Sequence, residues 1–193
     1  MLERLSSLGT GPRVETERLY LRPPRLGDWS QWATLRAESE RFLAPWEPVW
    51  TADSLSKANY KARLRRYTRD VREDEGQAFF LFLQESDQLV GGITLSNIRR
   101  GVAQTGTLGY WTGEKFARKG YMYEALLGML PVLFGEFGLR RVEAACLPSN
   151  ISSSKLLEKI GFSREGLARE YLCINSVWHD HLLYAILRND PLL

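Results

Sequence analysis

The chain has 193 residues, of which 44% are hydrophobic and 25% are charged, and its formal net charge is +3. This length predicts one good-sized domain with a full hydrophobic core. The small positive excess suits a phosphate-bearing ligand or an acidic partner but argues against a nucleic-acid binder, and no apolar run approaches the roughly 20 residues of a membrane-spanning helix.

The chain opens with Met-Leu-Glu-Arg, which lacks the basic-then-apolar layout of a secretory signal, so we expect a cytoplasmic protein. The two cysteines, Cys146 and Cys173, are too few for a disulfide framework and have no CxxC neighbour. We therefore expect both to be buried structural thiols, and we expect no metal site.

The first half of the chain mixes one strand with two helices. Residues 14–23 alternate leucines with polar neighbours and predict a strand closed by two prolines. Asp28 is placed to cap a short helix to about residue 36, and a loop rich in Pro and Trp covers 42–50. A long helix follows over 53–73, opened by Asp53, and its many basic residues favour a solvated face.

Three strand signals follow, over 78–84, 89–97 and 104–113, and they predict an antiparallel meander. The pattern then becomes helical from Gly120 to about Phe137, and Pro131 predicts a kink or a local break there.

The remaining segments are a strand over 140–147, a helix over 149–160, and a hairpin of 162–173 and 177–187 that turns at Asn175-Ser176. About seven strands and four helices result. We expect a single α/β (α+β) domain over 1–193, with a mixed central sheet and a core over about 14–188.

The junction around Gly120 is the first candidate for ligand chemistry. A strand ends near Thr112, a turn contains Gly113, and a helix starts at about Gly120. The first amides of a helix lack intrahelical partners and carry the positive end of its dipole, so they can hold a phosphate. Arg118 and Lys119 add positive charge, whereas no Walker loop or GxGxxG motif is present. The same pattern is also typical of a simple turn.

A second candidate lies in the helix over 149–160. Asn150 is a good N-cap residue, and Ser153 stands at the third helical position. Capping is the structural explanation for both. The Ile-Gly-Phe that ends the helix fits a glycine C-cap at Gly161.

Together these two segments resemble the GNAT family of acetyltransferases, which has a cofactor motif Q/R-x-x-G-x-G/A at a helix start and an N-x-x-S/A helix ending in GF. The resemblance extends over nearly the whole chain. The strand over 16–23, the Pro45-Trp-Glu-Pro48 loop and the ending over 171–184 are similar to the RimJ/RimL branch, which acetylates the N-termini of ribosomal proteins.

The resemblance implies a fold, an acetyl-CoA co-substrate and a set of cofactor-binding residues. Backbone groups of one strand would pair with the pantetheine arm, amides at the next helix start would hold the pyrophosphate, and residues of the second helix would reach the arm and the sulfur. The strand residues are Leu108, Tyr110, Trp111 and Thr112, and the residues at the helix start are Arg118, Lys119, Gly120, Tyr121, Met122 and Tyr123. The residues of the second helix are Asn150 and Ser153.

The chain departs from the family pattern at three positions. Ala117 stands where the motif has Gln or Arg, and Met122 stands where it has Gly or Ala, so phosphate binding would rest mainly on amides. Leu157 occupies the position at which many GNAT enzymes place a tyrosine acid. Ser153 is therefore the better candidate for the proton donor to the leaving thiolate.

The choice of acceptor depends on amine pKa values. An α-amine with a pKa of about 7.7–8.0 is roughly one quarter neutral near pH 7.4, whereas a lysine with a pKa of about 10.4 is neutral in about one part per thousand. Residues 104–107 carry no carboxylate where some GNAT enzymes have a base, which an α-amine acceptor tolerates better. Glu47 is the carboxylate that we expect near the acceptor, as a base or an ammonium ligand, with pairing to a surface arginine as its alternative role. Asp180 and His181 are weaker candidates.

The leading hypothesis is a RimJ-like enzyme that acetylates a protein N-terminus, with a ribosomal protein beginning with alanine or serine as acceptor. The alternatives are an acetyltransferase for a small amine, such as an antibiotic, polyamine or amino acid, and a non-catalytic acyl-CoA-binding regulator. We expect a monomer or a homodimer with no membrane or nucleic-acid partner.

Overall fold

The computed structural model describes residues 11–191, so the opening residues that bear on a secretory signal lie outside it. Within that range the chain forms eight strands and five α-helices, and no helix is long and apolar enough to cross a membrane. The strands are β1 (Val14–Glu15), β2 (Leu19–Arg22), β3 (Gln77–Leu83), β4 (Leu89–Arg99), β5 (Thr105–Thr112), β6 (Arg141–Cys146), β7 (Ser163–Ile174) and β8 (Val177–Leu187). The helices are α1 (Trp29–Glu38), α2 (Glu40–Leu43), α3 (Lys57–Arg72), α4 (Tyr121–Gly135) and α5 (Ile151–Ile160), with short 3-10 turns η1 (Leu26–Asp28), η2 (Ala44–Trp46) and η3 (Glu114–Phe116).

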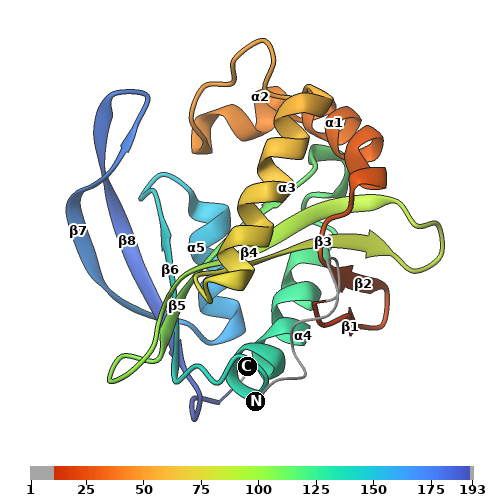
Figure 1. Ribbon diagram of the computed structural model, residues 1–193. Helices are drawn as coiled ribbons and strands as arrows, with labels where there is room; N and C mark the ends of the chain where they lie inside the picture. The colour runs from red at the N-terminus through yellow and green to blue at the C-terminus, as the bar shows by residue number, and fades with distance from the viewer. Residues whose placement is uncertain (1–10, 192–193) are drawn as a thin grey trace.

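All eight strands join one mixed sheet in the order β1-β2-β3-β4-β5-β6-β8-β7 (Figure 1). Every neighbouring pair is antiparallel except β5 and β6, which run parallel because α4 connects them. The expected α/β class and mixed sheet are confirmed, with one more strand and one more helix than predicted.

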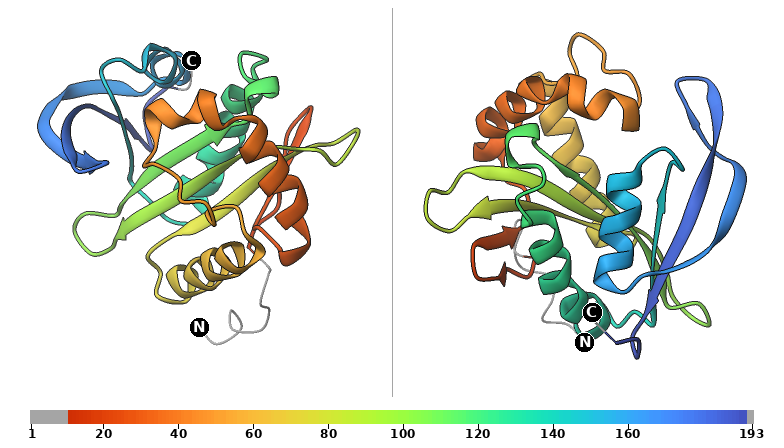
Figure 2. Two further views of the ribbon diagram at one scale, coloured as in Figure 1. Left: turned by 90° about the horizontal axis from the view of Figure 1, so that it is seen from above. Right: turned by 180° about the vertical axis from the view of Figure 1, so that it is seen from behind.

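The helices divide between the two faces of the sheet, which we call the front face and the back face. On the front face, Tyr60 of α3 is fully buried, with its ring 6.5 Å from that of Phe80 in β3 and 5.0 Å from that of Trp32 in α1. On the back face, Ser154 of α5 is hydrogen-bonded to Tyr184 of β8. Figure 2 shows α4 and α5 side by side on this back face.

Helix α4 is held by its apolar side. Leu126, Met129, Leu130 and Leu133 are all fully buried, as expected for side chains spaced three and four residues apart. Of the kink or local break predicted at Pro131, the break does not occur, since α4 continues as one helix to Gly135. Burial of this side compensates for the one backbone hydrogen bond that the proline removes.

The segment over 14–23 is two short strands rather than one. Thr16 donates its backbone N–H to the Leu19 carbonyl oxygen at 2.8 Å, and its hydroxyl oxygen accepts the Leu19 backbone N–H at 3.2 Å. This tight turn reverses the chain, so that β1 and β2 pair antiparallel. Side-chain bonding by threonine competes with continuous strand structure in this way.

The long front helix starts later than expected. Asp53 does not cap it; instead, the Ser56 hydroxyl accepts the Asn59 backbone N–H at 3.2 Å, and α3 begins at Lys57. Asp53 lies in the preceding turn, where its carboxylate accepts the hydroxyl of Thr51 at 2.6 Å.

The prediction of two buried cysteines is wrong for one of them. Cys146 is buried at the end of β6, but Cys173 is exposed. Cys173 lies in β7, the edge strand of a hairpin that projects away from the rest of the sheet (Figure 1). Strand character alone cannot show that both faces of such a hairpin meet solvent.

Candidate active site

Strands β5 and β6 are paired at their beginnings and separate toward their ends. Their ladder runs from Thr105↔Arg141 to Leu108↔Ala144 and stops there. Beyond Leu108, β5 pairs only with β4, and the last residues of β6 pair only with β8. Backbone groups of residues 109–112 that point toward β6 therefore have no strand partner among the described residues. We call this opening the fork.

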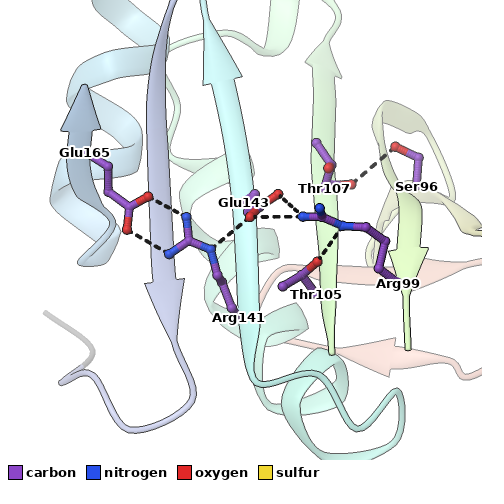
Figure 3. A network of polar contacts seen from close by, with 7 residues as sticks. All are labelled: Ser96, Arg99, Thr105, Thr107, Arg141, Glu143 and Glu165. Carbon is purple, nitrogen blue, oxygen red and sulfur yellow. Dashed lines mark hydrogen bonds and ion pairs between the residues drawn. The ribbon is translucent and has the colours of Figure 1, made fainter. Parts of the chain in front are cut away.

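A chain of charged side chains holds the paired half below the fork together (Figure 3). Glu143 accepts from Nε of Arg141 at 2.8 Å and from Nη2 of Arg99 at 3.2 Å. Arg141 also donates from Nη1 to Glu165 at 2.7 Å, and Arg99 donates from Nε to the Thr105 hydroxyl at 3.0 Å. These contacts tie β4, β5, β6 and β7 together on the front face. They confine the separation of the strands to the upper half of β5 and β6.

The turn before α4 has the backbone shape of an anion site. Gly120 has φ of +82°, in the left-handed region, and the right-handed helix starts at the next residue. A left-handed residue followed by a right-handed one points consecutive N–H groups into one concavity, which binds anions. Arg118 also has a positive φ, of 62°. Arg118 and Lys119 are exposed, and neither has an ion-pair partner in the described part of the chain.

Other residues of this turn contribute through the backbone rather than the side chain. The Met122 side chain is 7% exposed and belongs to the core, so only its amide can face a ligand. The Tyr123 ring lies 4.5 Å from the Lys159 ammonium of α5. These placements agree with a phosphate site made chiefly of amides.

Ser153 lies at the fork on the back face. Its backbone N–H donates to Oδ1 of Asn150 at 3.1 Å, so Asn150 caps α5 as its residue type suggests. The Ser153 hydroxyl is 2.7 Å from the hydroxyl of Tyr110, which comes from the open half of β5. Burial raises the pKa of Tyr110, and the Ser153 hydrogen bond opposes this only in part, so the phenol remains protonated.

Two further residues complete the surroundings of Ser153. Burial raises the pKa of the Cys146 thiol, and a hydrogen bond with Ser153 partly offsets it. Leu157, at the position of the family's usual tyrosine, is 1% exposed and packs in the core. The Tyr110 hydroxyl thus stands next to Ser153 although the usual tyrosine is absent. The sequence pattern had assigned Tyr110 a backbone role only.

The front face of the fork carries a cluster of Arg36, Glu47, Trp50 and Trp111. Glu47 accepts from Nη1 of Arg36 at 2.8 Å, also pairs with Nη2, and accepts the Trp50 indole N–H at 3.1 Å. The Arg36 guanidinium lies 4.3 Å from the Trp50 ring and 4.9 Å from the Trp111 ring. Glu47 is therefore brought to the fork, but as the partner of an arginine.

The arginine at the centre of this cluster is almost fully buried. The Arg36 side chain is 10% exposed, and its Nε is buried with no hydrogen-bond partner among the described residues. The charge of Arg36 is stabilised by Glu47 and by the faces of the two rings. Gly92 of β4 makes room for the Trp111 ring, because a Cβ on Gly92 would lie 2.7 Å from the Trp111 indole nitrogen.

The β7–β8 hairpin borders the same face. Val49 donates its backbone N–H to Oδ1 of Asn175 at 2.7 Å, which joins the loop after Glu47 to the tip of the hairpin. Asp180 accepts the backbone N–H of Glu170 at 2.8 Å, and His181 is 4% exposed with Nδ1 3.0 Å from the His179 carbonyl oxygen. Asp180 and His181 thus connect parts of the hairpin.

Adjacent residues of β5 place the two halves of the site on opposite faces. Successive strand residues point to opposite sides, so Tyr110 faces Ser153 at the back and Trp111 faces Arg36 at the front. A thioester lying in the fork would have hydroxyl donors on one side and the acceptor region on the other. Within residues 11–191, no three His, Cys, Asp or Glu side chains gather as a metal site.

The chain is similar to known acetyltransferases over most of its length. A family profile described as "Acetyltransferase (GNAT) domain" matches residues 18–163. A probable N-acetyltransferase of Bacillus subtilis, YjcK, is 34% identical over 92% of this chain and 98% of its own length. The [ribosomal protein uS5]-alanine N-acetyltransferase of Escherichia coli is 33% identical over 92% of each chain.

Solved structures agree with the sequence comparisons. Mycobacterium smegmatis RimJ in complex with CoA-disulfide superimposes with a TM-score of 0.85, at 29% identity, over 92% of this chain and 88% of that one. The ribosomal-protein-S5-alanine acetyltransferase of Vibrio fischeri gives 0.84 at 28% identity, over 93% and 98%. The resemblance inferred from the motifs is confirmed.

Proposed function

The chain belongs to the GNAT acetyltransferase family and is an acetyl-CoA-dependent N-acetyltransferase, and we propose that its acceptor is the N-terminal α-amine of a protein. The acceptor would be a ribosomal protein that begins with alanine or serine, and the enzyme would then work in the cytoplasm. The RimJ-type relatives support this choice, since one of them is named for alanine of ribosomal protein uS5.

The observation that carries the proposal is that two carboxylates on the front face, one at the fork and one below it, are paired with arginines. Glu47 is bound by Arg36, and Glu143 is bound by Arg99 and Arg141. A polyamine or an aminoglycoside carries several ammonium groups, and these partly neutralised carboxylates offer too little negative charge for more than one of them. A lysine acceptor needs a strong base, whereas an α-amine is already partly neutral at physiological pH.

The hairpin fits an acceptor larger than a small amine. Leu172, Val177 and Trp178 are 46%, 55% and 60% exposed, and they lie in the part of the hairpin that Val49 and Asn175 join to the front loop. Exposed apolar groups beside a site favour binding of a polypeptide segment.

The residues of the fork fit acetyl-CoA, which supplies the acetyl group as an activated thioester. Free backbone groups of residues 109–112 would hold the pantetheine arm, and the amides from Arg118 to Tyr123 would hold the pyrophosphate. Asn150, whose Oδ1 already caps α5, keeps a side-chain amide that can reach the arm.

Two side chains would carry the proton chemistry. The Ser153 hydroxyl would give a proton to the departing sulfur, with the protonated Tyr110 phenol at 2.7 Å as its neighbouring donor. Glu47 would bind the acceptor ammonium or take its proton through water. Its Oε1 accepts one hydrogen bond among the described residues, from Arg36, and can accept another.

The test is thiol release, corrected for hydrolysis, with a matched pair of peptides. One peptide has a free N-terminal alanine and an internal lysine, and its twin is N-terminally blocked. We expect release with the free peptide only, and an acceptor kcat/KM that rises with pH to about 8 and then levels, as the α-amine deprotonates.

Each of the other results has a clear meaning. Equal release with the blocked twin, and a rate still rising above pH 9, would point to lysine and overturn the proposal. Release only with polyamines, aminoglycosides or amino acids would establish a small-amine enzyme. Binding of acetyl-CoA without release for any acceptor would favour the non-catalytic regulator.

A further inference from the structure

Arg18 reaches the start of α4 from the other end of the chain. It follows the tight turn between β1 and β2, and its Nε donates to Oε2 of Glu124 at 2.6 Å, although the two residues are 106 positions apart. Nη1 donates to the carbonyl oxygen of Lys119 at 3.1 Å. Its guanidinium also lies 4.7 Å from the Tyr121 ring. Three residues at the start of α4 therefore hold this one side chain.

Glu124 fixes the direction of the guanidinium. Its Oε1 accepts the backbone N–H of Arg18 at 2.7 Å and the hydroxyl of Thr16 at 2.6 Å. Burial opposes the effect, but these bonds and the Arg18 charge lower the pKa of Glu124, which keeps it ionised. Both carboxylate oxygens are thus engaged, and neither of them binds Nη2, which we call the outer edge of the guanidinium.

That outer edge lies beside the left-handed glycine. A Cβ built on Gly120 would be 3.3 Å from Nη2 of Arg18. The guanidinium therefore lies directly beside the position that a side chain at residue 120 would occupy. None of the hydrogen bonds of the described residues uses Nη2, and the Arg18 side chain is 44% exposed. A hollow of about 680 Å³ runs from Arg18 along the first turns of α4, and it is lined by Thr16, Glu17, Arg18, Tyr123, Glu124, Leu127 and Gly128.

We infer that Arg18 is a third phosphate-binding cation of the acetyl-CoA site, one that the motif does not contain. Its free Nη2 donates to the anion held by the first amides of α4, alongside Arg118 and Lys119. A guanidinium is well suited to this because its planar donors match phosphate oxygens. Arg18 thereby supplies, from the turn before β2, the side-chain charge that Ala117 lacks. This inference rests on the proposed placement of the pyrophosphate at Gly120.

The experiment measures binding of coenzyme A alone by calorimetry, at several salt concentrations, with no acceptor present. Variants are Arg18→Ala, Arg18→Lys and the control Arg13→Ala. Arg13 is a comparable control, since it is 55% exposed, pairs with Glu15 and stacks on Tyr20, as Arg18 does with Glu124 and Tyr121.

We expect Arg18→Ala to weaken binding about tenfold, as loss of a charged hydrogen bond does. The affinity should also fall less steeply with salt, since one ion contact is gone. Arg18→Lys should recover most of the affinity, and Arg13→Ala should match the wild type.

Two results would overturn the inference. One is unchanged affinity in Arg18→Ala. The other is an equal loss of coenzyme A affinity in Arg18→Ala and Arg18→Lys, with the same salt dependence of binding as the wild type. That result would mean that Arg18 only supports the fold. Because no acceptor is used, an error in the proposed acceptor leaves this result unaffected. An error in the pyrophosphate placement would show separately, as unchanged binding in Gly120→Glu.

Discussion

The two sides of β5 are built in different ways. On the back, the proposed cofactor side contains a turn with left-handed residues, a helix start and a capped helix, each made within a short segment around Gly120 or Asn150. On the front, the acceptor side consists of side chains from distant segments, such as Arg36 with Trp111 and Val49 with Asn175. The proposed cofactor side therefore depends largely on local backbone geometry, with the Tyr110–Ser153 and Arg18–Glu124 contacts as long-range additions, and the proposed acceptor side depends on long-range side-chain contacts alone.

The contrast has a chemical reason. A pyrophosphate and a pantetheine arm are constant features of the co-substrate, and backbone amides can hold them with little regard to side-chain identity. An acceptor differs from one enzyme to another, and side chains are needed to distinguish it. Substitutions on the two sides should accordingly affect different steps.

The largest effect is expected on the cofactor side, from Gly120→Glu. The new side chain would sit on a left-handed residue, next to the guanidinium of Arg18, and would bring a negative charge to the anion site. Charge repulsion at such distances should weaken acetyl-CoA binding by roughly 100-fold or more, measured by calorimetry. Gly120→Ala is the control for backbone strain alone, which costs about 1 kcal/mol. Unchanged affinity in the glutamate variant would exclude this turn as the phosphate site.

An intermediate effect is expected from Ser153→Ala. The backbone N–H that Asn150 caps remains, so α5 should stay intact while the hydroxyl next to Tyr110 is lost. Removal of a proton donor should lower kcat roughly 10- to 100-fold and leave the KM for acetyl-CoA nearly unchanged.

Tyr110→Phe is the matched variant for the neighbouring hydroxyl in the same steady-state assay. If Tyr110→Phe loses less kcat than Ser153→Ala does, Ser153 is the direct proton donor. Equal turnover of wild type and Ser153→Ala would leave Ser153 as a helix-start residue only.

The smallest effect is expected on the acceptor side, from Glu47→Gln. The glutamine keeps the size of the side chain and loses the charge that Arg36 and an acceptor ammonium share. We expect the KM for the peptide to rise about fivefold, as for a partly exposed charged hydrogen bond, with kcat nearly constant. A large fall in kcat would instead make Glu47 the base. If neither kcat nor KM changes, the role of Glu47 is only to hold Arg36. In that case the variant should have a lower melting temperature than the wild type.

Much of the fold could be predicted because its signals are local. Alternating residues located the strands of the meander and the final hairpin, and the helix starts at Gly120 and Asn150 were found within a residue or two. Two element boundaries were missed where a nearby hydrogen bond overrode the pattern. Thr16 divided the first strand, and Ser56 rather than Asp53 capped α3.

The site was predicted unevenly for the same reason. Ser153, Gly120 and the open half of β5 follow from motifs, since a motif records a local backbone requirement. Arg36 lies in no motif, Arg18 lies in the segment over 16–23 without an assigned role, and the side chain of Tyr110 had no assigned role, because the contacts with Trp111, Glu124 and Ser153 join residues tens of positions apart.

The sequence by itself therefore determined the family and the co-substrate through its resemblance to known motifs, and it located the elements that meet at the fork through periodicity, caps and glycine. Only the tertiary structure decided that β5 and β6 part after Leu108, that Tyr110 and Trp111 serve opposite faces, and that Glu47 is already paired. Such contacts depend on how distant strands and loops are placed relative to one another, which no local pattern encodes.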